Sequence, residues 1–169
     1  MTAETTICVA GASGLVGSNI VRAALQRGYA VNGTLRDKDA PEKACYLTAL
    51  PGAEKLSLFS AEMSDEATFV APLAGADGVF IACLIPTYKG SDGTPAKEMD
   101  DVRGYAEIIM PTVDGCLNIL RAAYQQGVRT AVICSSTSST NPVPPVSVKN
   151  EVEHWSDADE QCREKKYTS

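Results

Sequence analysis

The amino-acid sequence predicts a doubly wound α/β fold, in which helices cover both faces of a parallel sheet. Three observations carry this prediction. Short apolar, β-rich runs recur along the 169-residue chain. Stretches with helical spacing separate these runs. Glycines follow the first run directly, in the segment "GASGLVG". Strands that alternate with helices pair in parallel through right-handed crossovers, which gives a doubly wound sheet.

Five runs are expected to be the strands of this sheet, with the spatial order 3-2-1-4-5. They are "TTICVA" (5–10), "AVNGTL" (30–35), "KLSLF" (55–59), "GVFIAC" (78–83) and "TAVICSS" (130–136). Ligands of such sheets bind beyond the carboxyl ends of the strands, so the segments that follow the strands are where a site is expected.

Two of the intervening stretches have clear helical periodicity. The first predicts a helix over 15–25 that stops at Gly28, and the second runs from Tyr105 to Gly127. Pro111 interrupts the second stretch. It predicts a kink there, unless the helix begins at this point with the proline in its first turn.

Composition narrows the classes of function. A formal net charge of -6 and the absence of a Lys/Arg run argue against nucleic acid or an anionic membrane as a partner. No segment has the roughly 18 apolar residues of a membrane span, and the N-terminus does not resemble a signal peptide, so a cytoplasmic protein is expected. Six dispersed cysteines without a CxxC pair, and a single histidine, predict no metal site. The cysteines at 8, 83, 116 and 134 are expected to be buried apolar residues.

The glycines of "GASGLVG" predict a dinucleotide-binding loop between the first strand and the first helix. Gly11 would permit the tight turn, Gly14 the close approach of a pyrophosphate, and Gly17 the close packing of helix and strand. The amino terminus of the helix would offer its free N–H groups to the phosphates. Further contacts are expected from Ser13, Leu15 and Val16. The alternative is a glycine-rich turn that serves packing only. If the loop binds a dinucleotide, the predicted sheet is of the Rossmann type.

The end of the second predicted strand favours NADP over NAD. Arg36 lies 19 positions after Gly17, and Lys43 follows shortly after. A cation at this place accommodates the 2′-phosphate of NADP, whereas a carboxylate would bind the ribose of NAD. Asp37 leaves a second interpretation open, in which its carboxylate pairs with Arg36 or faces the ribose.

Two longer segments interrupt the regular alternation. They span residues 84–104 and 137–161, and each follows a predicted strand. Both are candidates for the substrate side of the site, although long polar loops are often merely solvated.

Four segments together resemble the extended short-chain dehydrogenases/reductases, and most of all the dihydroflavonol reductase and cinnamoyl-CoA reductase group. They are "VAGASGLVGSNIVRAALQRGYAVNGTLRD", "AEMSDEATFVAPLAGADGVFIAC", "PTVDGCLNILRAA" and "AVICSSTSSTN". The resemblance implies that NADPH is the cofactor, with its pyrophosphate at the glycines and its 2′-phosphate at Arg36 and Lys43. It also implies that Glu62 and Met63 lie beside the adenine, and that Ala82 and Cys83 line the nicotinamide-ribose side. Thr112 stands where many members have an asparagine.

The resemblance further implies reduction of a small-molecule carbonyl by a serine, a tyrosine and a lysine. Ser136 matches the serine that orients the substrate oxygen, and Ser135 precedes it near the cofactor. The family's YxxxK motif would fall just past Ser169, and Tyr167 has no residue at the fourth position after it. We therefore expect residues 1–169 to be one Rossmann domain, truncated before this motif and before a C-terminal substrate lobe. Apolar surface around the last strand should then be exposed.

Two other functions are considered beside the reductase. One is a non-catalytic NADP-binding sensor or regulatory module, against which the intact serine segment speaks. The other is an NAD-dependent epimerase/dehydratase-type sugar-nucleotide enzyme, against which Arg36 and Lys43 speak. Relatives act as monomers or dimers, so a homodimer is left open.

Overall fold

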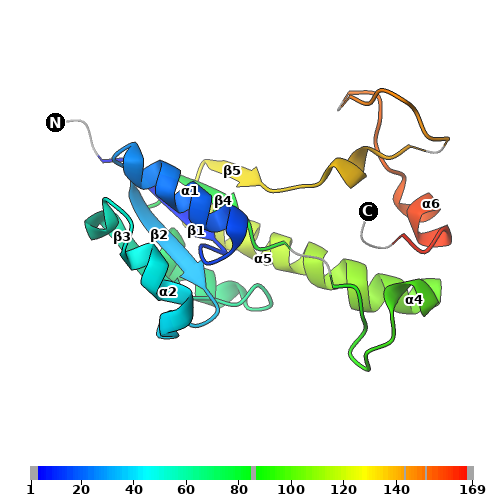
Figure 1. Cartoon of the computed structure of the whole chain (residues 1–169), viewed down its shortest axis with the longest axis horizontal. Helices are drawn as coiled ribbons and strands as arrows, with labels where there is room; N and C mark the ends of the chain where they lie inside the picture. Colours follow the sequence, from blue (N-terminus) through cyan, green and yellow to red (C-terminus); the bar gives the residue numbers. More distant parts are fainter. Residues whose placement is uncertain (1–3, 85–86, 143, 151, 167–169) are drawn as a thin grey trace. The chain divides into compact units, whose positions relative to one another are not determined.

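A five-stranded parallel sheet with the order β3-β2-β1-β4-β5 organises the fold (Figure 1). The computed structural model describes residues 4–84, 87–142, 144–150 and 152–166. The strands are β1 (Thr6–Ala10), β2 (Ala30–Leu35), β3 (Leu56–Ser60), β4 (Gly78–Ile81) and β5 (Thr130–Ile133). The predicted fold class, strand number and strand order are confirmed. Two predicted strands end earlier than expected, at Ile81 and Ile133.

β1 is the central strand and pairs with β2 and β4. Its residue Ile7 lies opposite Val31 on one side and Gly78 on the other. Successive side chains of a strand point to opposite faces, and here both faces are covered. Val9 faces a core formed with α1 (Leu15–Gln26) and α2 (Pro41–Thr48), while Cys8 faces one formed with α3 (Val70–Leu73) and α5 (Met110–Gln125). The glycine loop after Ala10 is thus anchored to the most buried strand.

Shorter helical elements complete the chain. The remaining α-helices are α4 (Asp101–Gly104) and α6 (Ala158–Arg163), and η4 (Tyr105–Ile109) is a π-helical stretch between α4 and α5. The 3-10 helices are η1 (Ala53–Lys55), η2 (Glu66–Phe69), η3 (Ala96–Glu98) and η5 (Thr137–Thr140). No helix in the described part of the chain is both long enough and apolar enough to span a membrane.

Pro111 lies in the first turn of α5, as one of the two sequence interpretations expected. The helical path nevertheless starts earlier, because α4 and η4 lead into α5 without a gap. Proline lacks the N–H that would continue the helical ladder, and its ring crowds the preceding turn. A wide π turn just before Pro111 accommodates both effects.

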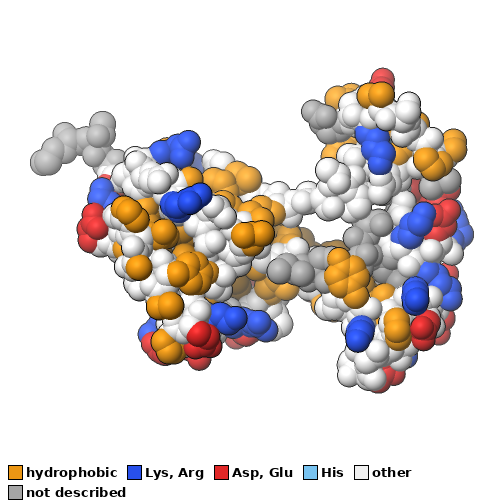
Figure 2. Space-filling model, in the orientation of Figure 1, with side chains coloured by type: hydrophobic (Ala, Val, Ile, Leu, Met, Phe, Trp, Pro, Cys, Tyr) orange, Lys and Arg blue, Asp and Glu red, His pale blue; other side chains and the backbone are white. Residues whose placement is uncertain are grey.

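The chain divides into two compact units. The first holds the whole sheet and comprises the residues up to Leu84 together with Asp114–Cys134. The second comprises the residues after Leu84 up to and including Val113, and the residues after Cys134. The two segments that were candidates for the substrate side therefore belong to the same unit, apart from Leu84. On the face seen in Figure 2, Lys and Arg side chains are interspersed with Asp and Glu.

β5 is an exposed strand of the first unit. Among the described residues it pairs with β4 alone. The exposed fractions of Val132 and Ile133 are 44% and 42%. Exposure of apolar surface at the last strand is thereby confirmed. A strand with one unpaired edge and apolar side chains is a template for pairing with another chain.

We expect the 169-residue chain to associate through β5 as its concentration rises. Val132→Lys should suppress this association, because a charged side chain on an edge strand opposes pairing. Sedimentation velocity at two protein concentrations measures the effect. Tyr124→Lys is the control, since Tyr124 is 83% exposed on α5 and outside the sheet. Equal suppression by both variants would contradict a role for the β5 edge.

Candidate functional site

The turn from β1 into α1 requires glycine at two positions, one in the loop and one in the first turn of the helix. Gly11 has φ +85°, and a Cβ there would lie 2.8 Å from the Cβ of Cys83. A Cβ at Gly17 would lie 2.1 Å from the carbonyl oxygen of Gly11. Gly14 differs, because its Cβ would meet that same oxygen at an ordinary 3.4 Å. Gly11 and Gly17 are therefore required by the fold, while Gly14 is free of any such packing requirement.

The amino terminus of α1 is left open for an anion. Its N-cap is Gly14, which has no side chain to accept a hydrogen bond from the first turn, and that turn contains no acidic residue. Leu15 is 84% exposed and Val16 is half exposed. Unpaired N–H groups and the positive end of the helix dipole together favour phosphate. The loop thus fits the diphosphate of a dinucleotide.

Thr34 fixes the start of this loop and was missed by the sequence interpretation. Its hydroxyl oxygen accepts a hydrogen bond from Gly11 N at 3.3 Å, and its carbonyl oxygen accepts one from Ala12 N at 2.8 Å. The side chain is 2% exposed. A hydroxyl within the otherwise apolar end of a predicted inner strand was the available signal, because buried polar groups need partners.

Two cations lie beyond the carboxyl end of β2. Arg36 directly follows this strand, Lys43 lies in α2, and both are exposed. Neither forms an ion pair within the described part of the chain. Asp37 forms no ion pair with Arg36 in the described part of the chain, and one of its carboxylate oxygens accepts a hydrogen bond from Asp39 N at 3.0 Å. The arrangement leaves two positive charges available for an anionic group.

Residues after β3 form the edge where the resemblance places the adenine. Glu62 is exposed, and Met63 is half-buried. Asn118 of α5 donates a hydrogen bond to the carbonyl oxygen of Met63 at 2.9 Å. A Cβ at Gly115 would come within 3.0 Å of the Met63 side chain. α5 therefore fixes the backbone and side chain of Met63.

The residues after β4 provide an uncharged wall. Ala82 N donates to the carbonyl oxygen of Ala10 at 2.9 Å, which extends the pairing of the two strands beyond β4. Burial raises the pKa of the Cys83 thiol to about 11 and that of Cys8 to about 12. Both thiols are neutral at physiological pH, so they add no negative charge near the phosphate loop.

In the second unit, Ser136 begins a turn that is stabilised by side-chain hydrogen bonds. Its hydroxyl oxygen accepts hydrogen bonds from Ser138 N at 3.2 Å and from the Ser138 hydroxyl at 2.9 Å. Ser156 donates to the carbonyl oxygen of Ser138 at 2.7 Å. Ser135 and Ser136 are both exposed. The turn presents the Ser136 hydroxyl in a defined conformation; Tyr167 lies outside the described residues.

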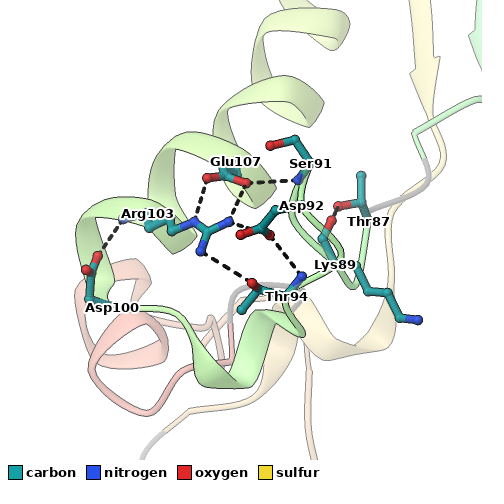
Figure 3. Close-up of polar contacts among 8 residues, drawn as sticks. All are labelled: Thr87, Lys89, Ser91, Asp92, Thr94, Asp100, Arg103 and Glu107. Atoms are coloured by element: carbon teal, nitrogen blue, oxygen red, sulfur yellow. Dashed lines mark hydrogen bonds and ion pairs between the residues drawn. The ribbon is translucent and has the colours of Figure 1, made fainter.

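Arg103 organises the segment that follows β4 (Figure 3). Its guanidinium contacts Asp92 at 2.6 Å and Glu107 at 2.7 Å. Glu107 also accepts a hydrogen bond from Ser91 N at 3.1 Å, and the Arg103 guanidinium reaches the Thr94 hydroxyl at 3.4 Å. One side chain from α4 thereby ties residues 91–94 to the helical run. This cluster could not be predicted from the sequence, because its members lie up to 16 positions apart and meet only in the folded chain.

The Arg103 cluster should make the second unit sensitive to acid. The hydrogen bond from Arg103 holds the pKa of Asp92 well below its usual range, with a further contribution from Thr94, and Arg103 and Ser91 lower the pKa of Glu107. A carboxyl group whose pKa is lower in the folded state stabilises the fold above its unfolded pKa of about 4. This stabilisation is lost as the pH falls through the folded-state value.

Arg103→Gln is therefore expected to lower the melting temperature at pH 7. The difference from the unsubstituted chain should narrow as the pH falls from about 4, the unfolded pKa, toward the lowered folded-state pKa values of the two carboxyl groups. Thermal melts at a series of pH values measure this. Lys97→Gln removes the same charge from an exposed residue of η3 and serves as the control. A difference that stays constant across the pH series would count against the ion-pair network.

Comparisons with known proteins agree with this geometry. Residues 11–167 match a family model described as NAD(P)H-binding. Dihydroflavonol 4-reductase from Hordeum vulgare is 38% identical over 164 residues, which cover 96% of this chain and 43% of that protein. An anthocyanidin reductase from Vitis vinifera is 32% identical over 157 residues, covering 91% and 43% of the two chains.

Solved structures show the same fold. Vestitone reductase from alfalfa (Medicago sativa) superimposes with a TM-score of 0.64 at 31% identity, over 94% of this chain and 44% of that one. The yeast methylglyoxal/isovaleraldehyde reductase Gre2, solved with NADPH, gives a TM-score of 0.66 at 22% identity, over 96% and 50% of the two chains. The chain thus spans less than half the length of the curated relatives reported above.

Proposed function

The chain belongs to the NAD(P)H-binding family, within the extended short-chain dehydrogenases/reductases, and from that membership we propose that it binds NADPH as the cofactor-binding part of a carbonyl reductase. The substrate would be a small-molecule ketone, aldehyde or acyl-CoA. The relatives whose names support this are reductases, and they extend well beyond the part that matches. We further propose that the protein is cytoplasmic.

One observation carries the choice of NADPH. Arg36 and Lys43, which form no ion pair with any described residue, lie where the second strand and the second helix meet. In this fold, that place receives the 2′ position of the adenosine ribose. A 2′-phosphate would neutralise both charges through charge-assisted hydrogen bonds. An NAD enzyme would instead be expected to present a carboxylate to the ribose at this place, whereas one oxygen of Asp37 accepts a hydrogen bond within its own turn.

Different residues of the chain would bind the parts of NADPH and orient the substrate. The N–H groups at the start of α1 would bind the diphosphate, and Met63 would contact the adenine. Bound NADPH supplies the hydride for the carbonyl carbon. Ser136 accepts two hydrogen bonds from Ser138, so its own proton remains available for the substrate oxygen. Such a donor stabilises the negative charge that develops on that oxygen.

The 169 residues contain no Tyr-x-x-x-Lys sequence. In the family, the tyrosine supplies the proton for the reduced oxygen, and the lysine lowers the pKa of the tyrosine. We therefore propose that the 169-residue chain binds NADPH without turning it over. A general acid typically contributes about 10²–10⁴-fold to the rate, so its loss removes most of the reaction.

Titration of the chain with NADPH and NADH, followed by the fluorescence of the reduced nicotinamide, tests the proposal. NADPH is expected to bind about tenfold more tightly or better, which corresponds to one charge-assisted contact. NADPH at about 100 times its Kd should stabilise the fold by about 2.7 kcal/mol, seen as a higher melting temperature. Equal or tighter binding of NADH would contradict the choice of cofactor. Absence of binding by either would contradict the function.

A further inference from the structure

Tyr46 connects α2 to the phosphate loop. Its hydroxyl donates a hydrogen bond to the carbonyl oxygen of Ser13 at 2.5 Å, across 33 positions of sequence. Ser13 lies between the two glycines Gly11 and Gly14 that shape the loop. Partial burial raises the pKa of Tyr46, so the hydroxyl keeps its proton and remains a donor at physiological pH.

The other contacts of the loop hold its start and close its turn. Thr34 accepts hydrogen bonds from Gly11 N and Ala12 N, and Gly14 N donates to the carbonyl oxygen of Gly11. Within the described residues, the carbonyl of Ser13 has its hydrogen bond from Tyr46 alone. Tyr46 therefore ties the middle of the loop, at Ser13, to α2.

The same helix carries one of the two cations proposed to bind the 2′-phosphate. Lys43 and Tyr46 are three positions apart in α2 (Pro41–Thr48), and residues at this spacing lie side by side on a helix surface. Pro41 and Glu42 favour the start of this helix, although its N-cap Ala40 makes no side-chain hydrogen bond. Tyr46 lies in its last turn. The bond from Tyr46 to Ser13 thus joins the element that carries Lys43 to the element that would bind the diphosphate.

We propose that Tyr46 is a positioning residue that sets the spacing between the two phosphate-binding elements of the NADPH site. This inference rests on the proposed function. With the hydrogen bond in place, Lys43 can bind the 2′-phosphate of a dinucleotide while the N–H groups of α1 bind the diphosphate of the same molecule. Without it, α1 and α2 still pack together through the buried Leu47, but the loop at Ser13 is no longer tied to α2, so the two elements are held less closely at one separation.

The test is a double-mutant cycle of Tyr46→Phe and Lys43→Ala, with Kd measured for NADPH and NADH. Tyr46→Phe keeps the ring and removes the hydroxyl, and is expected to raise the Kd for NADPH about two- to tenfold, the worth of one hydrogen bond. Lys43→Ala should weaken NADPH binding less when Tyr46→Phe is already present than in the original chain. Such non-additivity is the signature of coupled residues. Tyr124→Phe is the matched control, because Tyr124 is exposed on α5.

Hydrogen exchange without nucleotide gives a second readout. Amides of residues 12–16 should exchange faster in Tyr46→Phe than in the original chain or in Tyr124→Phe. Unchanged exchange, or effects of the two substitutions that simply multiply, would overturn the positioning role while leaving NADPH binding intact. Failure of the original chain to bind either dinucleotide would instead overturn the proposed function, and the positioning role with it.

Discussion

Alanine at position 17 is expected to weaken NADPH binding about a hundredfold or more and to lower the melting temperature. The added Cβ would lie 2.1 Å from the carbonyl oxygen of Gly11, so the loop and α1 must move apart. Overpacking of this kind typically costs about 1–3 kcal/mol. The displaced loop also loses its alignment with the diphosphate, and each lost charge-assisted hydrogen bond is worth about 1.5–3 kcal/mol. Fluorescence titration and thermal melting measure the two effects separately.

Gly14→Ala separates binding from folding at the same loop. Its Cβ would make only an ordinary contact of 3.4 Å, and its backbone has φ -77° and ψ 167°, which any residue adopts. We expect an unchanged melting temperature with NADPH binding weakened about tenfold or more, because the methyl group occupies the approach to the phosphates. Gly78→Ala in β4, where the nearest atom is at 3.5 Å, is the control for both. Full binding by Gly14→Ala would contradict the phosphate-cradle interpretation.

Arg36→Ala is expected to raise the Kd for NADPH about tenfold while changing that for NADH by less than about twofold. Arg36 is exposed beyond β2 and has no ion-pair partner among the described residues, so its removal leaves no orphaned acid behind. The effect should therefore appear in binding and not in the melting temperature. Adding Lys43→Ala should weaken NADPH binding further.

Arg121→Ala provides the matched control, since it removes the same charge from an exposed position on α5. The advantage of NADPH over NADH should also shrink as salt is added, because exposed charges are screened over about 10 Å at 0.1 M. Equal losses of NADPH and NADH affinity in Arg36→Ala would place this arginine outside the 2′-phosphate site.

The sequence predicted the sheet well because the sheet depends on local patterns. Apolar periodicity and the glycine turn located all five strands and their order. The fifth strand was predicted through Ser136, but its pairing with β4 ends at Ile133, opposite Ile81. The fourth strand was predicted too long because its apolar run continues past the point where Ala10 ends β1. Beyond that point the neighbouring backbone turns away into the glycine loop, and hydrophobicity alone does not mark where pairing stops.

The candidate site was predicted less completely. Gly11 and Gly17 could be predicted because positions that have no room for a Cβ must be glycine, and glycine is visible in the sequence. Thr34 and Tyr46 could not, since their roles depend on contacts with residues 23 and 33 positions away. Arg103 was likewise hidden within a segment that looked like a polar loop. The roles of Ser136, Arg36 and Lys43 remain predictions, and the substitutions above are designed to test those of the two cations.

The central position of β1 also determines how the protein folds during synthesis. The partner of β1 on one side, β4, is made about 70 residues after β1, because Ile7 pairs with Gly78. At about 5–20 residues per second, the chain spends several seconds with one side of its innermost strand unpaired. The apolar residues of β1 are exposed to other nascent chains during that interval. Codons that slow translation between β3 and β4 should therefore lower the yield of folded protein, even though they leave every contact of the final structure unchanged.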